Sequence, residues 1–112
     1  MPTTPTFIDT KTIIVNLLKA DQAKYLSFGR LQDLLFFIYD KLKERCELEN
    51  YNIFFNINFD AIVRTVRYND MIFGLDIDAE RIYLREPQSI DTLAQQYPVD
   101  EIISDIILTY AA

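Results

Sequence analysis

The sequence contains no histidine, and this absence excludes more functions than any residue that is present. Without histidine, Ser-His-Asp and Cys-His catalysis are excluded, as are His-ligated zinc, haem and copper. The single cysteine, Cys46, also excludes an internal disulfide and cysteine-ligated zinc or iron–sulfur sites within one chain. No carboxylate pair stands out as a catalytic pair. We therefore expect a protein that is not an enzyme, with no catalytic residue, no metal site and no cofactor.

Glycine and long apolar runs are also scarce. The two glycines, Gly29 and Gly74, lie in no G-x-G or G-K-[ST] context, so the sequence has no phosphate-binding glycine loop. The longest apolar run, 34–39, is far below the roughly 20 residues that span a bilayer. The first nine residues have neither the basic nor the apolar segment of a signal peptide. These absences predict a cytoplasmic protein that does not enter a membrane.

The chain of 112 residues suits one domain, with 50% hydrophobic and 25% charged residues. Proline and threonine in 1–8 predict an extended N-terminal arm, and 9–112 is expected to form a single domain. Cys46 follows Leu42 by four residues on an apolar helical stripe, which predicts a small core or boundary residue.

Apolar periodicity and capping residues predict most of the secondary structure. Ser27 is a candidate N-cap, and either Asp9 or Thr10 can cap the first helix. A connector is expected over 20–29, and a strand reading of 59–67 remains open beside the favoured helix. Helices are expected over 10–19, 28–47, 59–67, 92–96 and 98–111, and strands over 51–57, 71–77 and 81–85. The fold class is therefore α+β: two N-terminal helices, a small antiparallel sheet that includes a 71–85 hairpin, and two C-terminal helices.

Three carboxylates, Asp76, Asp78 and Glu80, alternate with apolar residues where the hairpin turns. A calcium loop that began at Asp76 would need Gly at its sixth position and Glu at its twelfth, where this chain has Arg81 and Pro87. The calcium interpretation therefore fails. The polar tip of a hairpin is the favoured interpretation, because Asp is common in turns.

The net charge is −6, and it is unevenly distributed. Residues 1–45 carry seven Lys and Arg against five Asp and Glu, whereas residues 46–112 carry four against twelve. A segment with the spacing of a helix-turn-helix, 89–106, presents only acids on its second helix. DNA binding needs cations, so two packed helices are the favoured interpretation there. The charge fits a basic protein partner more easily.

The order of a helix at 59–67 followed by a hairpin resembles the recognition helix and wing of winged-helix domains. This resemblance would place four arginines on a nucleic-acid-binding face: Arg64, Arg67, Arg81 and Arg85. Six acids in the same region oppose nucleic acid, so we expect it less than a protein partner.

Eight Phe and seven Tyr give the chain a large apolar surface. This surface either fills one core or forms a homodimer or partner interface, and periodicity does not separate the two. The first hypothesis is therefore a small acidic cytoplasmic module that binds a protein partner, in the manner of an inhibitor, an immunity or antitoxin-like protein, or a chaperone-like regulator. Its expected partner-binding residues are Asp76, Asp78, Glu80, Asp100, Glu101 and Asp105. The alternative is a winged-helix-like regulator associated with nucleic acid through the four arginines.

Overall fold

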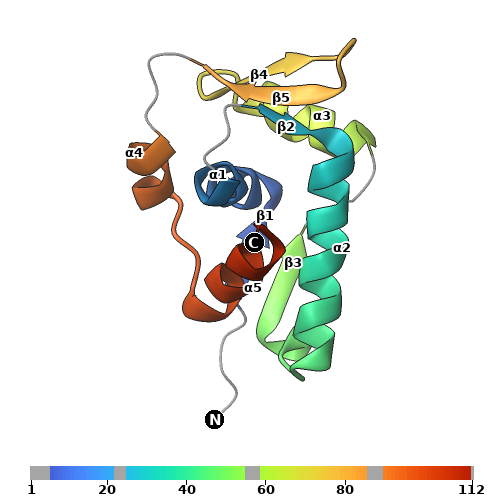
Figure 1. Cartoon of the computed structure of the whole chain (residues 1–112), viewed down its shortest axis with the longest axis vertical. Coiled ribbons are helices and arrows are strands. Elements are labelled where there is room, and N and C mark those ends of the chain that lie inside the picture. The colour runs from blue at the N-terminus through green and yellow to red at the C-terminus, as the bar shows by residue number, and fades with distance from the viewer. Residues whose placement is uncertain (1–5, 22–24, 55–58, 86–89, 112) are drawn as a thin grey trace.

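The computed structural model of the chain describes residues 6–21, 25–54, 59–85 and 90–111. These residues form the predicted α+β fold, with α-helices, short strands and one 3-10 helix (Figure 1). The α-helices are α1 (Thr10–Asp21), α2 (Phe28–Glu44), α3 (Phe59–Tyr68), α4 (Ile90–Gln96) and α5 (Glu101–Ala111). The strands are β1 (Thr6–Asp9), β2 (Tyr25–Ser27), β3 (Tyr51–Phe54), β4 (Phe73–Asp76) and β5 (Arg81–Leu84), and the 3-10 helix is η1 (Leu48–Asn50). The helical prediction for 59–67 is confirmed.

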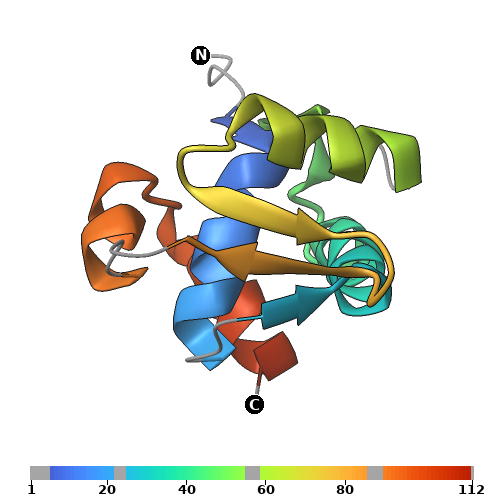
Figure 2. The ribbon, with the colours of Figure 1, turned by 90° about the horizontal axis from the view of Figure 1, so that it is seen from above.

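A three-stranded antiparallel sheet contains the predicted hairpin. Its order is β2–β5–β4, and α3 lies beside the β4 edge (Figure 2). Directly after the hairpin turn, Arg81 pairs with Asp76 on one side and with Ser27 on the other. Strand β2 falls within 20–29, where only a connector was predicted. That prediction was wrong because three residues are too few to show a period of two.

The strand predicted over 51–57 does not join the hairpin sheet. Residues 51–54 form β3, which pairs in parallel with β1, and residues 55–57 lie outside the described residues. The pairing runs from Thr6 opposite Tyr51 to Asp9 opposite Phe54. Residues 6–9 of the N-terminal segment are therefore part of a second, two-stranded sheet.

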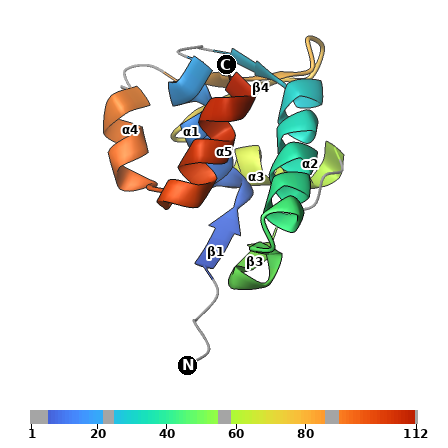
Figure 3. The same cartoon turned by 60° about the horizontal axis from the view of Figure 1, so that its bottom comes forward.

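Helix α1 is the centre of the core. It contacts α4, α5, α3 and both sheets, and α5 lies between α1 and α2 (Figure 3). Five of its apolar side chains are at most 1% exposed: Ile13, Ile14, Val15, Leu17 and Leu18. A helix that is apolar around most of its circumference must be covered on several sides, and here it is.

Side chains cap three of the helices. The Oγ of Ser27 accepts the N–H of Arg30 at 3.1 Å, and a carboxylate oxygen of Asp9 accepts the N–H of Thr12 at 2.8 Å. Both candidate caps are confirmed, with Asp9 rather than Thr10 at the first helix. The last helix begins at Glu101, not at Pro98 as predicted, because Oδ1 of Asp100 accepts the N–H of Ile103 at 2.9 Å.

Helix α2 ends in a Schellman motif. The N–H of Cys46 donates to the carbonyl of Lys43 at 3.2 Å, and the N–H of Glu47 donates to that of Leu42 at 2.9 Å. This geometry needs a left-handed residue, and Cys46 supplies it at φ 57°. The cysteine is exposed, so its prediction as a core or boundary residue was wrong. The helix ends at Glu44 before its stripe reaches position 46.

In the part of the chain that the structure describes, no helix has the length and apolarity that crossing a bilayer requires.

Candidate functional site: the hairpin tip

The turn between β4 and β5 exposes one apolar side chain and two carboxylates, and the neighbouring strand β2 exposes a second apolar side chain. Ile77 is 52% exposed, and Tyr25 of the neighbouring strand β2 is 53% exposed. Asp78 and Glu80 are exposed in the same turn. We call these four residues, Tyr25, Ile77, Asp78 and Glu80, the tip surface.

Hydrogen bonds fix the backbone of the turn. Oδ1 of Asp76 accepts the N–H of Ala79 at 3.1 Å, and the N–H of Glu80 donates to the carbonyl of Ile77 at 3.2 Å. Glu80 has φ 52°, a left-handed conformation that closes the turn. Its carbonyl accepts the N–H of Phe28, the first residue of α2, at 3.0 Å. The tip is therefore anchored on the start of α2, which Figure 1 shows beside it.

Arg81 joins the carboxylate side of the tip to Tyr25. Its guanidinium carbon lies 4.4 Å from the centroid of the Tyr25 ring, and its Nε lies 3.8 Å from Oδ2 of Asp76. The first contact is a cation–π interaction, worth about 0.5–1 kcal/mol at an exposed site. The second is an ion pair at the outer distance limit and adds little. Arg81 thus orients the tyrosine ring rather than extending freely into solvent.

The three carboxylates of the turn have different roles. Asp76 bonds the turn and faces Arg81, whereas Asp78 and Glu80 form no side-chain hydrogen bond or ion pair with any described residue. Asp76, Asp78, Glu80 and Arg81 together give the turn a net charge of −2. Among the residues that the structure covers, no three Cys, Asp or Glu side chains converge as metal ligands would. The free charge of the tip is therefore negative.

The other three acids predicted to bind a partner, Asp100, Glu101 and Asp105, lie near the end of α2 that is far from the tip. Arg45, just after that helix, bonds Asp105 at 2.5 Å, while the tip lies at the start of the helix. A helix of 17 residues is about 25 Å long, so the two acidic groups do not form one surface.

The members of this second group are partly used within the chain. Besides capping α5, Asp100 accepts the hydroxyl of Tyr51 at 2.7 Å, and Asp105 pairs with Arg45. Burial, together with this hydrogen bond to the carboxylate, raises the pKa of Tyr51. Glu101 is exposed and forms no hydrogen bond or ion pair with the described residues. Of the three, only Glu101 is free to contact a partner without breaking such a contact.

Of the four arginines of the nucleic-acid alternative, two are held by contacts within the chain and two are not in any ion pair with the described residues. Arg81 is held by Tyr25, and Nε of Arg85 donates to the carbonyl of Phe73 at 3.1 Å. Arg64 and Arg67 are exposed on α3 and lie in no ion pair with the described residues. They border a hollow of about 480 Å³, together with Asp60, Val63 and Tyr68.

Sequence reasoning missed the apolar half of the tip surface. Ile77 was expected to be the last residue of the strand over 71–77, but the strand ends at Asp76 and Ile77 is exposed in the turn. Tyr25 was placed in a connector. No local pattern could have paired it with Tyr83, because that pairing joins residues far apart in the sequence.

Comparisons with known protein families, with curated proteins and with solved structures found no match to this chain.

Proposed function

We propose that the protein is a non-enzymatic interaction module that binds a basic protein partner through its tip surface. The observation that supports this most is the exposure of about half of Ile77 in the turn and of Tyr25 on the adjacent strand, together with two carboxylates whose side chains have no partner among the described residues. Aromatic and aliphatic side chains supply most of the energy of protein interfaces, and charges around them supply specificity and association rate.

The rigidity of the tip favours this proposal. The hydrogen bonds of Asp76, Ile77 and Glu80 hold the turn before any partner arrives. A surface that is already ordered loses less conformational entropy when it binds. Burial of a whole isoleucine side chain contributes about 1.5–3 kcal/mol, so covering the exposed half of Ile77 would contribute about 1 kcal/mol.

The charges of the tip indicate the chemistry of the partner. Asp78 and Glu80 would meet Lys or Arg side chains, and the net charge of −6 would speed the approach of a basic protein. A role as an inhibitor, as an immunity or antitoxin-like protein, or as a chaperone-like regulator fits this surface, and its location in the cytoplasm and the formation of a homodimer belong to the same proposal.

Charge reversal tests the proposal. A quantitative pull-down from the source cells would compare wild type with Asp78→Lys/Glu80→Lys. The matched control is Asp40→Lys/Glu49→Lys, which reverses two exposed acids outside the tip and changes the net charge equally. We expect one basic protein to be lost from the tip variant and kept by the control. Equal recovery by both variants would contradict the proposal.

A second function, binding of nucleic acid, is supported by the sheet order. Strand β2, which directly precedes α2, pairs with the second strand of the hairpin that follows α3. This arrangement fits the winged-helix resemblance, with α3 as the helix that would meet DNA and with Arg64 and Arg67 free on it. The carboxylates of the tip argue against this second function, because a wing next to DNA would place these negative charges near the negative phosphates.

Fluorescence anisotropy with a labelled DNA duplex at low salt distinguishes the second function. It predicts binding that weakens steeply as salt rises and is lost in Arg64→Ala/Arg67→Ala. Lys41→Ala/Lys43→Ala, on α2, is the control with the same change of charge. Absence of binding at low salt would eliminate this function and leave the tip proposal unaffected.

A further inference from the structure

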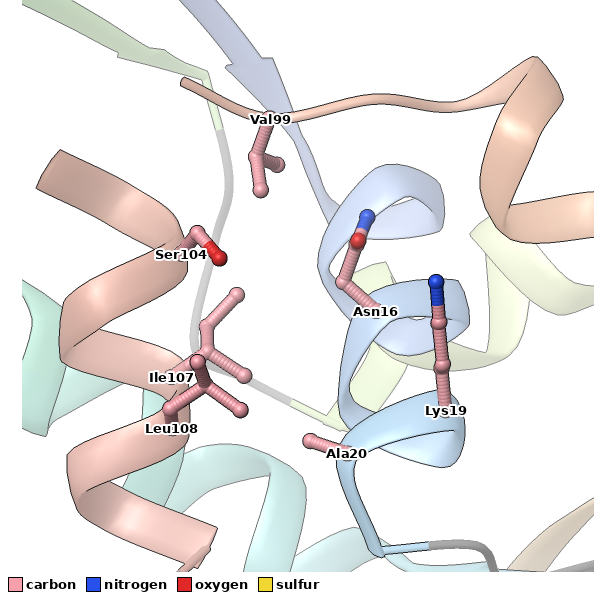
Figure 4. A pocket seen from close by; sticks show the side chains of 7 residues that line it. All are labelled: Asn16, Lys19, Ala20, Val99, Ser104, Ile107 and Leu108. Carbon is pink, nitrogen blue, oxygen red and sulfur yellow. The ribbon is translucent and has the colours of Figure 1, made fainter. Parts of the chain in front are cut away.

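A groove lies between α1 and α5 and shares no residue with the tip surface. Its volume is about 360 Å³, within the range of small-molecule sites. Figure 4 shows Asn16 and Lys19 on α1 and Ser104, Ile107 and Leu108 on α5, with Val99 of the preceding segment above.

The walls of the groove are mainly apolar. Ile107 is 2% exposed and closes the bottom, whereas Leu108 is 58% exposed at the rim. Val99 and Ala20 are half-buried and complete the apolar lining. An aliphatic chain lying here would cover Leu108 and leave the water that it otherwise contacts.

Two hydrogen bonds hold Asn16 in place at one side of the groove. Its Nδ2 donates to the carbonyl of Thr12 and to that of Tyr97, both at 2.8 Å. The second bond spans 81 positions of the sequence and ties α1 to the end of α4. The polar wall on α1 is therefore ordered, and it is tied to the segment that leads to α5.

Among the described residues that line the groove, Lys19 is the only charged one. It is exposed and forms no ion pair or hydrogen bond with any residue that the structure describes. A lysine stem is long and flexible, so its ammonium can move toward a bound anion while its methylenes cover the apolar lining. The Ser104 hydroxyl on the facing helix is a second hydrogen-bond donor (Figure 4).

We propose that this groove binds an aliphatic monocarboxylate, with the carboxylate at Lys19 and Ser104 and the chain against Ile107 and Leu108. The described residues of the lining carry one positive charge and no negative one, so they favour an anionic head group over a cationic one. The apolar walls favour a hydrocarbon tail over a polar metabolite. The proposal is independent of the tip surface, because no residue is shared.

Titration with octanoate, followed by amide NMR spectra of the whole chain, tests this site. We expect saturable shifts at Asn16, Ser104 and Leu108, including the Asn16 side-chain amide. Lys19→Met should weaken binding by about fivefold, as for the loss of one exposed charge-assisted contact. Lys43→Met, an exposed lysine on α2, should leave the affinity unchanged. Leu108→Asp should abolish binding, and its melting curve would show that the fold is kept.

Comparison ligands make each part of the proposal refutable. Octylammonium should bind more weakly than octanoate, and acetate should not bind measurably because it lacks the chain. No saturable shift with octanoate at millimolar concentration would overturn the proposal. So would shifts confined to other surfaces, equal affinity of Lys19→Met and wild type, or octylammonium binding as tightly as octanoate.

Discussion

The hydrogen bond between Tyr51 and Asp100 should make a measurable contribution to stability, because it joins β3 to the start of α5. Tyr51 is 7% exposed, and its hydroxyl lies 2.7 Å from Oδ2 of Asp100. A hydrogen bond to a charged group contributes about 1.5–3 kcal/mol. Since Asp100 remains open to solvent, we take the low end, so Tyr51→Phe should lower the free energy of unfolding by about 1.5 kcal/mol.

Asp100 has a second role that separates the two parts of its contribution. Its Oδ1 caps α5 through the N–H of Ile103, and loss of a cap costs about 1 kcal/mol. Asp100→Ala should therefore cost about 2.5 kcal/mol, the sum of both contacts. The double variant Tyr51→Phe/Asp100→Ala should cost no more than Asp100→Ala alone, which corresponds to a coupling energy of about 1.5 kcal/mol.

Urea denaturation followed by circular dichroism at 222 nm gives all four free energies of this cycle. Tyr39→Phe is the control, since that tyrosine is exposed and should lose no stability. Additive losses, with a coupling energy near zero, would refute the hydrogen bond as the link between β3 and α5.

Three further predictions follow from the same contacts. Cys46→Gly should raise the free energy of unfolding by about 1 kcal/mol in urea denaturation, because glycine adopts the left-handed conformation at φ 57° without strain. Cys46→Ala should give no gain, and a loss of stability in Cys46→Gly would contradict the Schellman motif. Ser27→Ala should lower the melting temperature in a thermal scan by several degrees through loss of the α2 cap, whereas Ser27→Asp should keep the wild-type melting temperature. Equal melting temperatures of Ser27→Ala and wild type would argue against the cap. Burial and Asp100 raise the pKa of Tyr51 in the folded state, so above about pH 10 the tyrosine ionises in the unfolded chain first. The free energy of unfolding of wild type should therefore fall more steeply with pH there than that of Tyr51→Phe. Parallel profiles of the two free energies against pH would contradict this.

Local patterns in the sequence were sufficient for most helices and for the hairpin. The apolar stripe of α2 was predicted to run from Leu31 to Cys46, and its members up to Leu42 are buried, with Ser27 as the cap. The same stripe misled at Cys46, because periodicity does not show where a helix ends. The end became visible only through the Schellman bonds that follow Glu44.

Long-range pairing accounts for what the sequence did not show. The three residues of β2 are a strand only because β5 pairs with them, and β3 is a strand because β1 lies beside it. The candidate site was affected in the same way. Its carboxylates were found from the turn sequence, whereas Tyr25 reached the tip through the pairing of β2 with β5.

Site-specific photocrosslinking in the source cells tests the tip surface most directly. A photoreactive amino acid would replace Ile77 in one variant and Leu108 in another, two aliphatic residues of similar exposure, 52% and 58%, on surfaces that share no residue. We predict one discrete crosslink to a basic protein from position 77, absent from position 108 and lost when Asp78→Lys/Glu80→Lys is added. No crosslink at position 77, or the same product from both positions, would contradict the proposal that the hairpin tip binds the partner.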